Sequence, residues 1–379
     1  MRIVYVVARP TQFEAPFFRF AARDPRHQLR VILTDADPFG AVLDRELGRT
    51  VDWGIDLVGG YSHEQCPLES RGAWLSARLH REACDLVITN GYTSPVHVRA
   101  ALVARRARVA TGLRLDSVPI RRGPRWVLRK VLFAVALRRL YDVFFATGTL
   151  TLQYLRSMGV PVDRAALFPY AVDVAHFREH ARISSETRRG LRGQLGVPAE
   201  AKVVLSLAKF NKREAPWDLL RAFARDPRTE AWLVLAGDGP ERPDLEAFAS
   251  LHGQRRVRFP GYVAYAQLPA LYGAADLFVH PAREERWGVS VAEALASGLP
   301  VVASSGVGAA ADLVAPGENG YTYEAGRDEE LSRLVVAALE LDAGRVRARS
   351  EGILARWDYQ ATWASLVAAA ERVTERRTA

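Results

Sequence analysis

Glu285 and Glu293 are the residues of this chain whose type and spacing point most directly to chemistry. The apolar run Leu277–Val279 leads into a polar loop that carries Glu285, and a helix expected to open at Ser290 carries Glu293 in its first turn. A carboxylate accepts hydrogen bonds from two neighbouring hydroxyls, and the amino end of a helix attracts an anion. The two acids therefore predict a site that holds a sugar joined to a phosphate.

Glu293 also fits a purely structural role. Ser290 and Glu293 have the spacing of a capping box, in which a glutamate three residues after a serine stabilises the start of a helix. The segment Gly298-Leu299-Pro300 ends the same helix before the next apolar run. Within this strand, loop and helix pattern we favour a ligand role for Glu293. No local structural role accounts for Glu285.

Apolar runs of strand length alternate with helical stretches along the chain, which is typical of buried parallel sheets. In the first half the expected strands are Ile3–Val7, Val31–Leu33, Leu86–Thr89, Arg108–Ala110 and Val143–Ala146. In the second half they are Val203–Leu207, Trp232–Ala236, Val257–Phe259, Leu277–Val279, Val301–Ala303 and Gly320–Tyr323. Two such series predict an α/β protein built from two doubly wound, Rossmann-like units.

The length of 379 residues also favours two domains. We expect a first domain over residues 1–180, a second over 181–355, and a C-terminal helix within 356–379 that packs back on the first domain. The boundary is expected in the stretch 174–200, where a helix over Ser185–Leu195 precedes the second domain's first strand.

In an open parallel sheet the loops at the carboxyl ends of the strands gather along one edge, where ligands bind. In the second half, a basic loop with Lys209, Lys212 and Arg213 follows the first strand. Glycine turns follow the next two strands, at Gly237 and just before Val263. A further strand, Val301–Ala303, ends in the glycine-rich segment 304–309. This edge is the predicted ligand site.

This order of strand exits resembles glycosyltransferase family 4, whose members are retaining enzymes that use nucleotide sugars. The family has the GT-B fold, with two doubly wound domains facing across a cleft. The resemblance is strong over residues 200–325 and looser over 1–180. Glu285 and Glu293 fit the family's Glu-x7-Glu motif, with Gly288 between them and the Glu-Ala-Leu-Ala-Ser-Gly-Leu-Pro-Val-Val run after them.

The resemblance implies donor-binding roles at these positions. Glu293 would hold the ribose of the donor and Glu285 the transferred sugar. The backbone amides of Gly288, Val289 and Ser290 would cradle the diphosphate at the helix N-terminus. Gly237 and Val263, at the neighbouring strand exits, are further donor-binding candidates.

The family also places a basic pair after the first strand of this domain, which neutralises the leaving diphosphate. Lys209 fits the first position of the pair. Glu214 stands where a lysine is expected at the second, so Arg213, with Lys212 beside it, is the candidate there. Because side chains supply the positive charge, the resemblance implies no metal ion and no cofactor other than the nucleotide sugar as co-substrate.

The acceptor is expected at the same edge of the first domain, where strand exits carry Thr11, Gln12, Asn90, Tyr92 and Arg114. Many relatives have a histidine near the third exit, and here Asp116 follows Arg114 instead. Asp116 is the candidate base for the acceptor hydroxyl, with capping of a helix as the alternative. His97 is expected in a helix and receives no catalytic role.

The net charge of +9 is unevenly distributed: residues 1–190 carry +11 and residues 191–379 carry −2. The excess is concentrated in the segment 121–139, which contains no acid. A basic amphipathic helix of this kind can lie on an anionic membrane, although it is equally typical of a half-buried helix with a solvated arginine face. No aromatic stacking platform accompanies the charge, so we expect no nucleic-acid partner.

The two cysteines, Cys66 and Cys84, lack metal-binding spacing, and no apolar run reaches the roughly 18 residues that span a bilayer. We therefore expect a cytoplasmic bacterial enzyme, at the inner face of the membrane if 121–139 binds lipid. The expected reaction is transfer of a sugar to a hydroxyl of a glycan, a lipid-linked sugar or a small molecule. The alternatives are a sugar-nucleotide 2-epimerase on the same fold and a non-catalytic nucleotide-sugar-binding protein.

Overall fold

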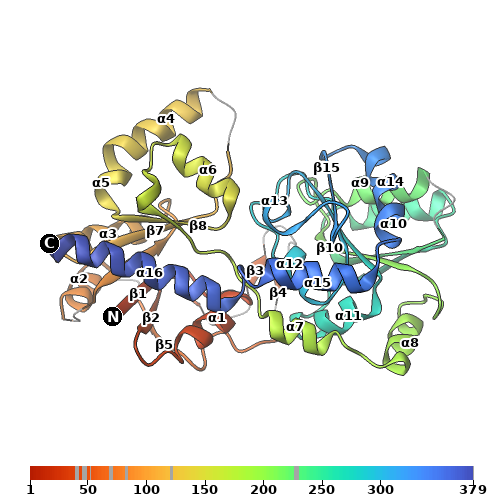
Figure 1. The fold of residues 1–379 in the computed structure, drawn as a ribbon, viewed down its shortest axis with the longest axis horizontal. Helices are drawn as coiled ribbons and strands as arrows, with labels where there is room; N and C mark the ends of the chain where they lie inside the picture. Colours follow the sequence, from red (N-terminus) through yellow and green to blue (C-terminus); the bar gives the residue numbers. More distant parts are fainter. Residues whose placement is uncertain are drawn as a thin grey trace. The chain divides into compact units, whose positions relative to one another are not determined.

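The computed structural model describes residues 1–38, 42–44, 49–51, 53–67, 71–81, 84–119, 123–225 and 230–378. The chain divides into two compact units (Figure 1). Unit 1 comprises Met1–Gly40, Asp56–Ala171 and Trp357–Ala379, and unit 2 comprises Ala41–Ile55 and Val172–Arg356. The last helix of the chain therefore belongs to the unit that contains the first strand.

In the described part of unit 1, seven parallel strands form a sheet in the order β5-β2-β1-β6-β7-β8-β9. The strands are β1 Arg2–Val7, β2 Gln28–Leu33, β5 Ser62–Gln65, β6 Leu86–Asn90, β7 Ala110–Leu115, β8 Val143–Ala146 and β9 Ala165–Leu167. The chain builds outward from β1 in both directions. The carboxyl ends of β1 and β6 therefore flank the switch point of this sheet.

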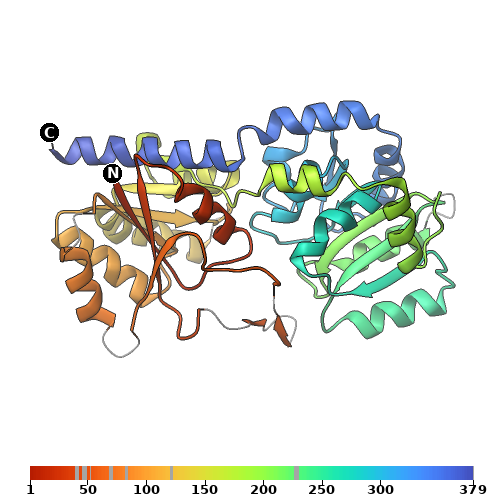
Figure 2. The ribbon, with the colours of Figure 1, turned by 90° about the horizontal axis from the view of Figure 1, so that it is seen from below.

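Helices cover both faces of this sheet. They are α1 Glu14–Ala21, α2 Arg71–Arg81, α3 Pro95–Arg106, α4 Pro124–Leu132, α5 Arg138–Leu140, α6 Thr149–Ser157 and α16 Tyr359–Thr378, with a π-helical turn over Phe133–Leu137 and a 3-10 turn over Val162–Arg164. Ile3, Tyr5 and Val7 of β1 pack with α1 and α16, which lie on the same side of the sheet in Figure 2. Val4 and Val6 pack with α2 and α3 on the other side. This alternation explains the uninterrupted apolar run of β1.

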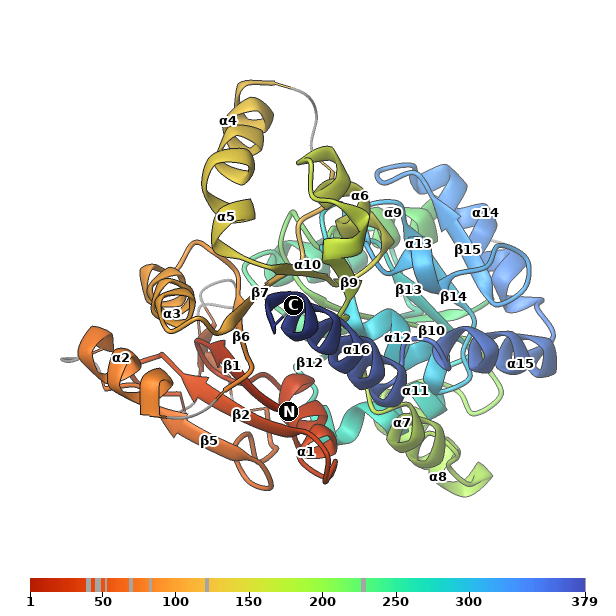
Figure 3. The ribbon, with the colours of Figure 1, turned by 60° about the vertical axis from the view of Figure 1, so that its left-hand side comes forward.

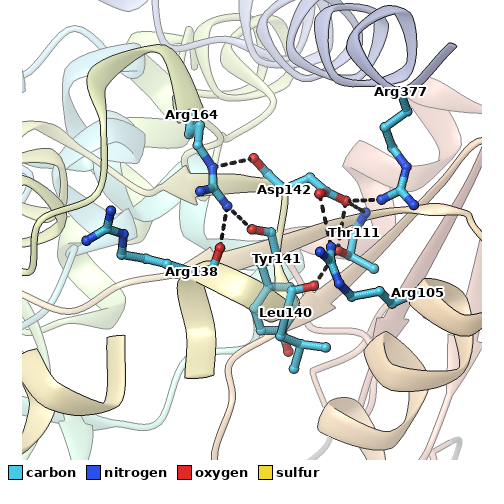
Figure 4. A network of polar contacts seen from close by, with 8 residues as sticks. All are labelled: Arg105, Thr111, Arg138, Leu140, Tyr141, Asp142, Arg164 and Arg377. Carbon is cyan, nitrogen blue, oxygen red and sulfur yellow. Dashed lines mark hydrogen bonds and ion pairs between the residues drawn. The ribbon is translucent and has the colours of Figure 1, made fainter. Parts of the chain in front are cut away.

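The C-terminal helix α16 packs on the rest of unit 1 through apolar and polar contacts. Trp363 and Leu366 of α16 lie in the apolar core, and the Trp363 Nε1–H donates to Asp24 Oδ2 at 2.9 Å. Near the end of the helix, Arg377 Nη1 lies 2.7 Å from Asp142 Oδ2 (Figure 4).

Asp142, which precedes β8, is the centre of the network in Figure 4. Its carboxylate accepts the Thr111 N–H at 3.0 Å and Arg105 Nη1 at 3.2 Å, and its carbonyl accepts Arg164 Nε at 3.0 Å. One acid therefore joins α3, β7, β8 and α16.

In the described part of unit 2, six parallel strands form a sheet in the order β12-β11-β10-β13-β14-β15. The strands are β10 Val203–Lys209, β11 Trp232–Asp238, β12 Val257–Gly261, β13 Leu277–His280, β14 Val301–Ser304 and β15 Gly320–Tyr323. The switch point lies between β10 and β13. The short strands β3 Val42–Asp44 and β4 Arg49–Val51 form an antiparallel pair.

The helices of unit 2 are α7 Val174–His180, α8 Ser185–Gln194, α9 Pro216–Arg225, α10 Arg242–Leu251, α11 Leu268–Ala274, α12 Val289–Ala296, α13 Ala310–Leu313, α14 Asp328–Leu339 and α15 Ala343–Leu354, with a 3-10 turn over Tyr265–Gln267. Helices α9, α10 and α14 pack over one face of the sheet around a core that includes Leu233 and Val279. Within the described residues, every helix of the chain is too short or too polar to traverse a bilayer.

The predicted pair of doubly wound α/β units is confirmed, but one predicted strand is wrong. The apolar pattern predicts a strand at Arg108–Ala110 and a loop after it. The structure has a turn at Arg108, where φ is 61°, and β7 runs from Ala110 to Leu115. The error arises because Arg114 is a charged residue inside a buried strand, where its charge is compensated by Glu14.

Candidate functional site

The switch point of unit 2 brings the basic loop and the Glu285 loop together. β10 and β13 are neighbours, so Lys209 at the end of β10 and His280 at the end of β13 lie on the same edge of the sheet. The backbone of the two loops is joined where the Arg283 N–H donates to the Arg213 carbonyl at 2.8 Å. The predicted cations therefore lie at the end of β10 and in the loop after it, beside the Glu285 loop.

Glu285 is held in place through its backbone by the glycine-rich exit of β14. Its N–H donates to the Gly306 carbonyl at 2.8 Å, and its carbonyl accepts the Gly308 N–H at 2.9 Å. A Cβ atom on Gly306 would lie 2.3 Å from the Arg283 carbonyl oxygen, and one on Gly308 would lie 2.1 Å from that of Arg286. The glycines predicted as a strand exit thus allow the two loops to approach closely.

Arg213 bridges two carboxylates. Its Nη1 donates to Glu285 Oε2 at 3.2 Å, and its Nη2 donates to Glu214 Oε1 at 2.9 Å. The side chain of Asn211 fixes the loop because its Oδ1 accepts the N–H groups of both Arg213 and Glu214 at 3.0 Å. Glu214 is 6% exposed and depends on Arg213 for charge compensation. The lysine expected at position 214 is thus replaced by an acid that holds the neighbouring arginine.

His280 completes this cluster. It is 3% exposed, and its Nδ1 has no hydrogen-bond partner among the described residues. Burial lowers the pKa of His280 to about 4, so the ring is neutral near pH 7. Ligand atoms of Glu214, His280 and Glu285 lie within 4.8 Å of one another, a donor set that could take a metal ion. The Arg213 guanidinium already binds both of these carboxylates.

The amino end of α12 faces the same edge. Gly288 is its N-cap with φ 93°, and a Cβ atom there would meet Val307 Cγ1 at 2.7 Å. The Val291 N–H bonds to the Gly288 carbonyl at 3.1 Å, whereas the amides of Val289 and Ser290 precede the first intrahelical bond. These two amides are free of helical acceptors and suit an anion.

The capping-box interpretation of Ser290 and Glu293 is wrong. The helix begins at Val289, one residue earlier than expected, and its N-cap makes no side-chain bond. The carboxylate of Glu293 instead accepts a hydrogen bond from Tyr272 Oη of α11 at 2.9 Å. Glu293 is 5% exposed, and this burial raises its pKa to about 7 even though the Tyr272 bond lowers it. The tyrosine was missed because no local spacing links it to Glu293.

The other donor-side candidates lie along the same edge of unit 2. Lys209 is half-buried, Lys212 is exposed, and Val263 follows β12. Gly237 lies inside β11 rather than in a turn after it. A Cβ atom at this position would lie 1.9 Å from the Ala208 carbonyl oxygen, so glycine permits the close approach of β10.

The predicted acceptor-side residues are all in unit 1. Thr11 lies in the turn before α1: its hydroxyl donates to Glu14 Oε2 at 3.1 Å and accepts the Glu14 N–H at 3.3 Å. Gln12 is half-buried in the same turn. The Asn90 carbonyl lies 2.8 Å from His97 Nδ1, and His97 lies in α3 as predicted. Tyr92 follows β6 and packs edge-on against Phe133.

Arg114 and Asp116 differ from each other in their surroundings. Arg114 is 2% exposed, and its guanidinium donates to Tyr5 and Glu14 and to the carbonyls of Phe168 and Pro169. We therefore assign Arg114 a structural role in place of an acceptor contact. Asp116 is half-exposed just beyond β7, in a segment that is not helical, so helix capping does not account for it.

Comparison with known proteins adds family information to this geometry. Residues 187–354 match the sequence profile of the glycosyl transferases group 1. The alpha-monoglucosyldiacylglycerol synthase of Streptococcus pneumoniae is 36% identical over 147 residues, which is 38% of this chain and 33% of that protein. A D-inositol 3-phosphate glycosyltransferase of Xylanimonas cellulosilytica is 31% identical over 233 residues, 59% of this chain and 55% of that protein. The matched part thus spans about half or less of these relatives.

Solved structures match over the full length at low identity. The HepE protein of Anabaena in complex with UDP superposes with a TM-score of 0.74 at 20% identity and covers 100% of both chains. A glycosyltransferase from Rickettsia africae superposes with a TM-score of 0.77 at 14% identity and covers 98% of both chains. At this level of identity the likeness establishes the fold.

Proposed function

We propose that this chain, whose residues 187–354 match the glycosyl transferases of group 1 and whose fold is the GT-B fold, moves a sugar from a nucleoside-diphosphate sugar to an acceptor hydroxyl with retention of configuration. The contact between Glu285 and Arg213 beside the amino end of α12 carries this proposal. This site combines a carboxylate that can accept hydrogen bonds from sugar hydroxyls, a cation, and amides that have no acceptor within the helix. All three lie at the switch point of the sheet of unit 2.

Each group in this site has a proposed task. The amides of Val289 and Ser290 bind the diphosphate, and Arg213 and Lys209 neutralise the charge that develops as it leaves. Glu285 accepts hydrogen bonds from the transferred sugar. Glu293 accepts hydrogen bonds from the ribose, which reaches a carboxylate already oriented by Tyr272. In unit 1, Asp116 is the proposed acceptor-side base.

We propose a uridine diphosphate sugar as the donor. HepE of Anabaena, whose fold this chain shares, has been crystallised with UDP and with UDP-glucose. This supports testing uridine first among the bases. The basic loop at 209–213 offers positive charge for any nucleoside diphosphate, so the base is decided elsewhere.

A nucleotide screen tests the proposed function. UDP-, GDP-, ADP- and dTDP-sugars are each added to the purified protein, and the melting temperature is recorded. We expect a uridine nucleotide to raise the melting temperature, because a ligand that binds only the folded state stabilises that state. Failure of every nucleotide to raise the melting temperature would reject it.

The products distinguish the enzyme classes. A transferase releases UDP only when an acceptor hydroxyl is present, or slowly to water. A 2-epimerase converts the nucleotide sugar without releasing UDP, and a binding protein leaves the donor intact. Chromatography of the nucleotide pool after incubation separates the three.

A second proposal concerns the acceptor's location: α4 binds an anionic membrane surface. None of the residues of α4 is buried, and Val127, Leu128 and Val131 are 53%, 70% and 51% exposed. Arg129 and Lys130 supply positive charge beside this apolar face. Figure 3 shows α4 and α5 in line along one margin of unit 1. The similarity to a synthase named for a diacylglycerol glycolipid is consistent with a lipid acceptor.

Vesicle sedimentation tests the membrane proposal. We expect the protein to bind phosphatidylglycerol vesicles and to bind phosphatidylcholine vesicles little. The Arg125→Ala/Arg129→Ala/Lys130→Ala variant is expected to lose binding, because each basic residue contributes about 1 kcal/mol to the binding free energy. The matched control is Arg189→Ala/Arg333→Ala/Arg345→Ala, three exposed arginines of unit 2. Equal binding by wild type and the α4 variant would contradict the proposal. Arg121 and Arg122, which the predicted basic segment also includes, lie outside the described residues.

A further inference from the structure

A cavity of about 450 Å³ lies in unit 2 at the edge of the sheet opposite the donor side. It borders the residues just before three strands: Lys202 before β10, Asp276 before β13 and Pro300 before β14. The Glu285 loop and the amino end of α12 lie at the carboxyl ends of the same strands. The cavity is therefore separate from the proposed donor site, and its size suits a small molecule.

The side chains around this cavity are predominantly cationic. Five cations line it: Arg178, Arg182, Arg188, Lys202 and Arg347. Two acids line it, and both are already paired: Asp276 binds Arg188 at 2.8 Å and Arg192 at 2.7 Å, and Glu351 lies 3.5 Å from Arg178. Among the described residues, Arg182, Lys202 and Arg347 have no carboxylate partner.

Neutralisation of helix ends does not account for these three side chains. The carboxyl ends of α11 and α12 border the cavity, and basic residues stabilise such ends. That role is filled at α11 by Arg188, which donates to the Gly273 carbonyl at 2.9 Å, and by Arg192, which donates to the Ala274 carbonyl at 3.0 Å. In the described structure Arg182, Lys202 and Arg347 donate to no such carbonyl. These three side chains are exposed and line the cavity.

The floor of the cavity is apolar. Leu295, Leu299 and Ala338 are less than 9% exposed, and Tyr272 contributes its ring while its hydroxyl binds Glu293 on the donor side. A ligand here would therefore bury an apolar part against the floor. Three cations from three separate segments, without a carboxylate partner in the described part of the chain, match a phosphate, which has three terminal oxygens, better than a carboxylate, which has two.

We propose that this cavity binds a small molecule that carries a phosphate group on an apolar body. The phosphate lies among Arg182, Lys202 and Arg347, and the apolar part lies on Leu295 and Leu299. The proposal is independent of the donor site, because none of the donor-side side chains at the carboxyl edge lines the cavity.

Isothermal titration calorimetry with phenyl phosphate tests this proposal, with UDP present in excess to occupy the donor site. The expected result is saturable binding of one phenyl phosphate per chain, tighter than inorganic phosphate and tighter than phenol. The Arg182→Ala/Lys202→Ala/Arg347→Ala variant is expected to bind at least about a hundredfold more weakly, since it loses three charge-assisted contacts that are each worth about tenfold. The Arg182→Lys/Arg347→Lys variant keeps the charge and is expected to retain most of the affinity.

The control removes the same charge elsewhere in unit 2. Arg189, Arg333 and Arg345 lie on α8, α14 and α15, which also border the cavity, but these side chains are exposed and do not line it. Their triple alanine variant is expected to bind phenyl phosphate like wild type. The proposal is overturned if wild type shows no saturable binding, or if the cavity and control variants weaken binding equally. Melting curves of both variants, in the absence of ligand, verify that each is folded.

Discussion

Burial of the Glu293 carboxylate is expected to lower the free energy of unfolding at neutral pH. Its pKa in the folded protein is about 7, against 4.5 for an exposed glutamate. Below pH 4.5 the group is protonated in both states, and between pH 4.5 and 7 the folded state alone keeps the proton. The free energy of unfolding is therefore expected to fall as pH rises through this window, by about 3 kcal/mol in total.

The Glu293→Gln variant tests this linkage and the ribose role together. It keeps an oxygen for Tyr272 but cannot ionise, so we expect it to be more stable than wild type above pH 7 and equally stable near pH 4. We also expect weaker UDP binding, because a neutral amide accepts the ribose hydroxyls less strongly. Urea unfolding at several pH values and calorimetry with UDP measure the two effects. Unchanged UDP affinity would refute the ribose role.

Arg213 is the cation that we expect to act on the diphosphate. Arg213→Ala should reduce turnover by about a hundredfold or more, as expected for loss of a group that stabilises developing charge. It should also destabilise unit 2, because Glu214 is buried and loses its ion-pair partner. Rates at saturating donor, with urea unfolding of the same samples, separate the two losses.

The double variant Arg213→Ala/Glu214→Lys sharpens this prediction. It removes the buried acid and places a cation one residue further along the loop, where the family has a lysine. We expect it to recover a substantial part of the lost turnover. If the double variant were no more active than Arg213→Ala while remaining folded, the exchange of roles between positions 213 and 214 would be wrong.

Arg114 joins four segments of unit 1 from inside β7. It contacts Tyr5 of β1, Glu14 of α1 and the carbonyls that follow β9, and its guanidinium stacks 4.0 Å above the Phe168 ring. Arg114→Met is expected to lower the free energy of unfolding by about 3–5 kcal/mol, because Glu14 would remain buried without a counter-charge.

The companion variant for Arg114 removes both charges. Glu14→Gln/Arg114→Met is expected to be more stable than Arg114→Met alone, since no uncompensated charge remains. Denaturant unfolding of the wild type, of Glu14→Gln, of Arg114→Met and of the double variant gives the coupling between the two sites. A double variant less stable than Arg114→Met would show that the hydrogen bonds matter more than the charge balance.

Elements with a local signature could be predicted from the sequence. The apolar strands and the carboxyl-edge loops were found because buried parallel strands are continuously apolar and because their exits share an edge. β7 was misplaced because the partner that neutralises Arg114 lies 100 residues away. The capping box, which was the alternative role of Glu293, is absent because the carboxylate of Glu293 bonds to Tyr272 on another helix. Side-chain pairs that are distant in the sequence produce no local pattern from which they could be predicted.

At the scale of the whole chain, the two units are not continuous in sequence. Unit 1 begins with β1 and is completed by α16, after the chain has formed nearly all of unit 2. Trp363 and Leu366 of α16 complete the core beside β1, and Arg377 completes the Asp142 network. The stability of unit 1 therefore depends on residues that follow unit 2 in the sequence.

Deletion of residues 357–379 is expected to unfold unit 1 and leave unit 2 folded. The deletion removes six side chains of α16 that are buried in the core of unit 1: Tyr359, Trp363, Leu366, Ala369, Ala370 and Val373. The larger ones contribute about 1.5–3 kcal/mol each, which is a large part of the 5–15 kcal/mol that stabilises a typical domain. Hydrogen exchange should show β7 and β8 losing protection while β10 and β13 keep it. Arg377→Ala, which removes one half-exposed ion pair, should cost no more than about 1 kcal/mol. Retained protection of β8 in the truncated chain would show that unit 1 folds without its last helix.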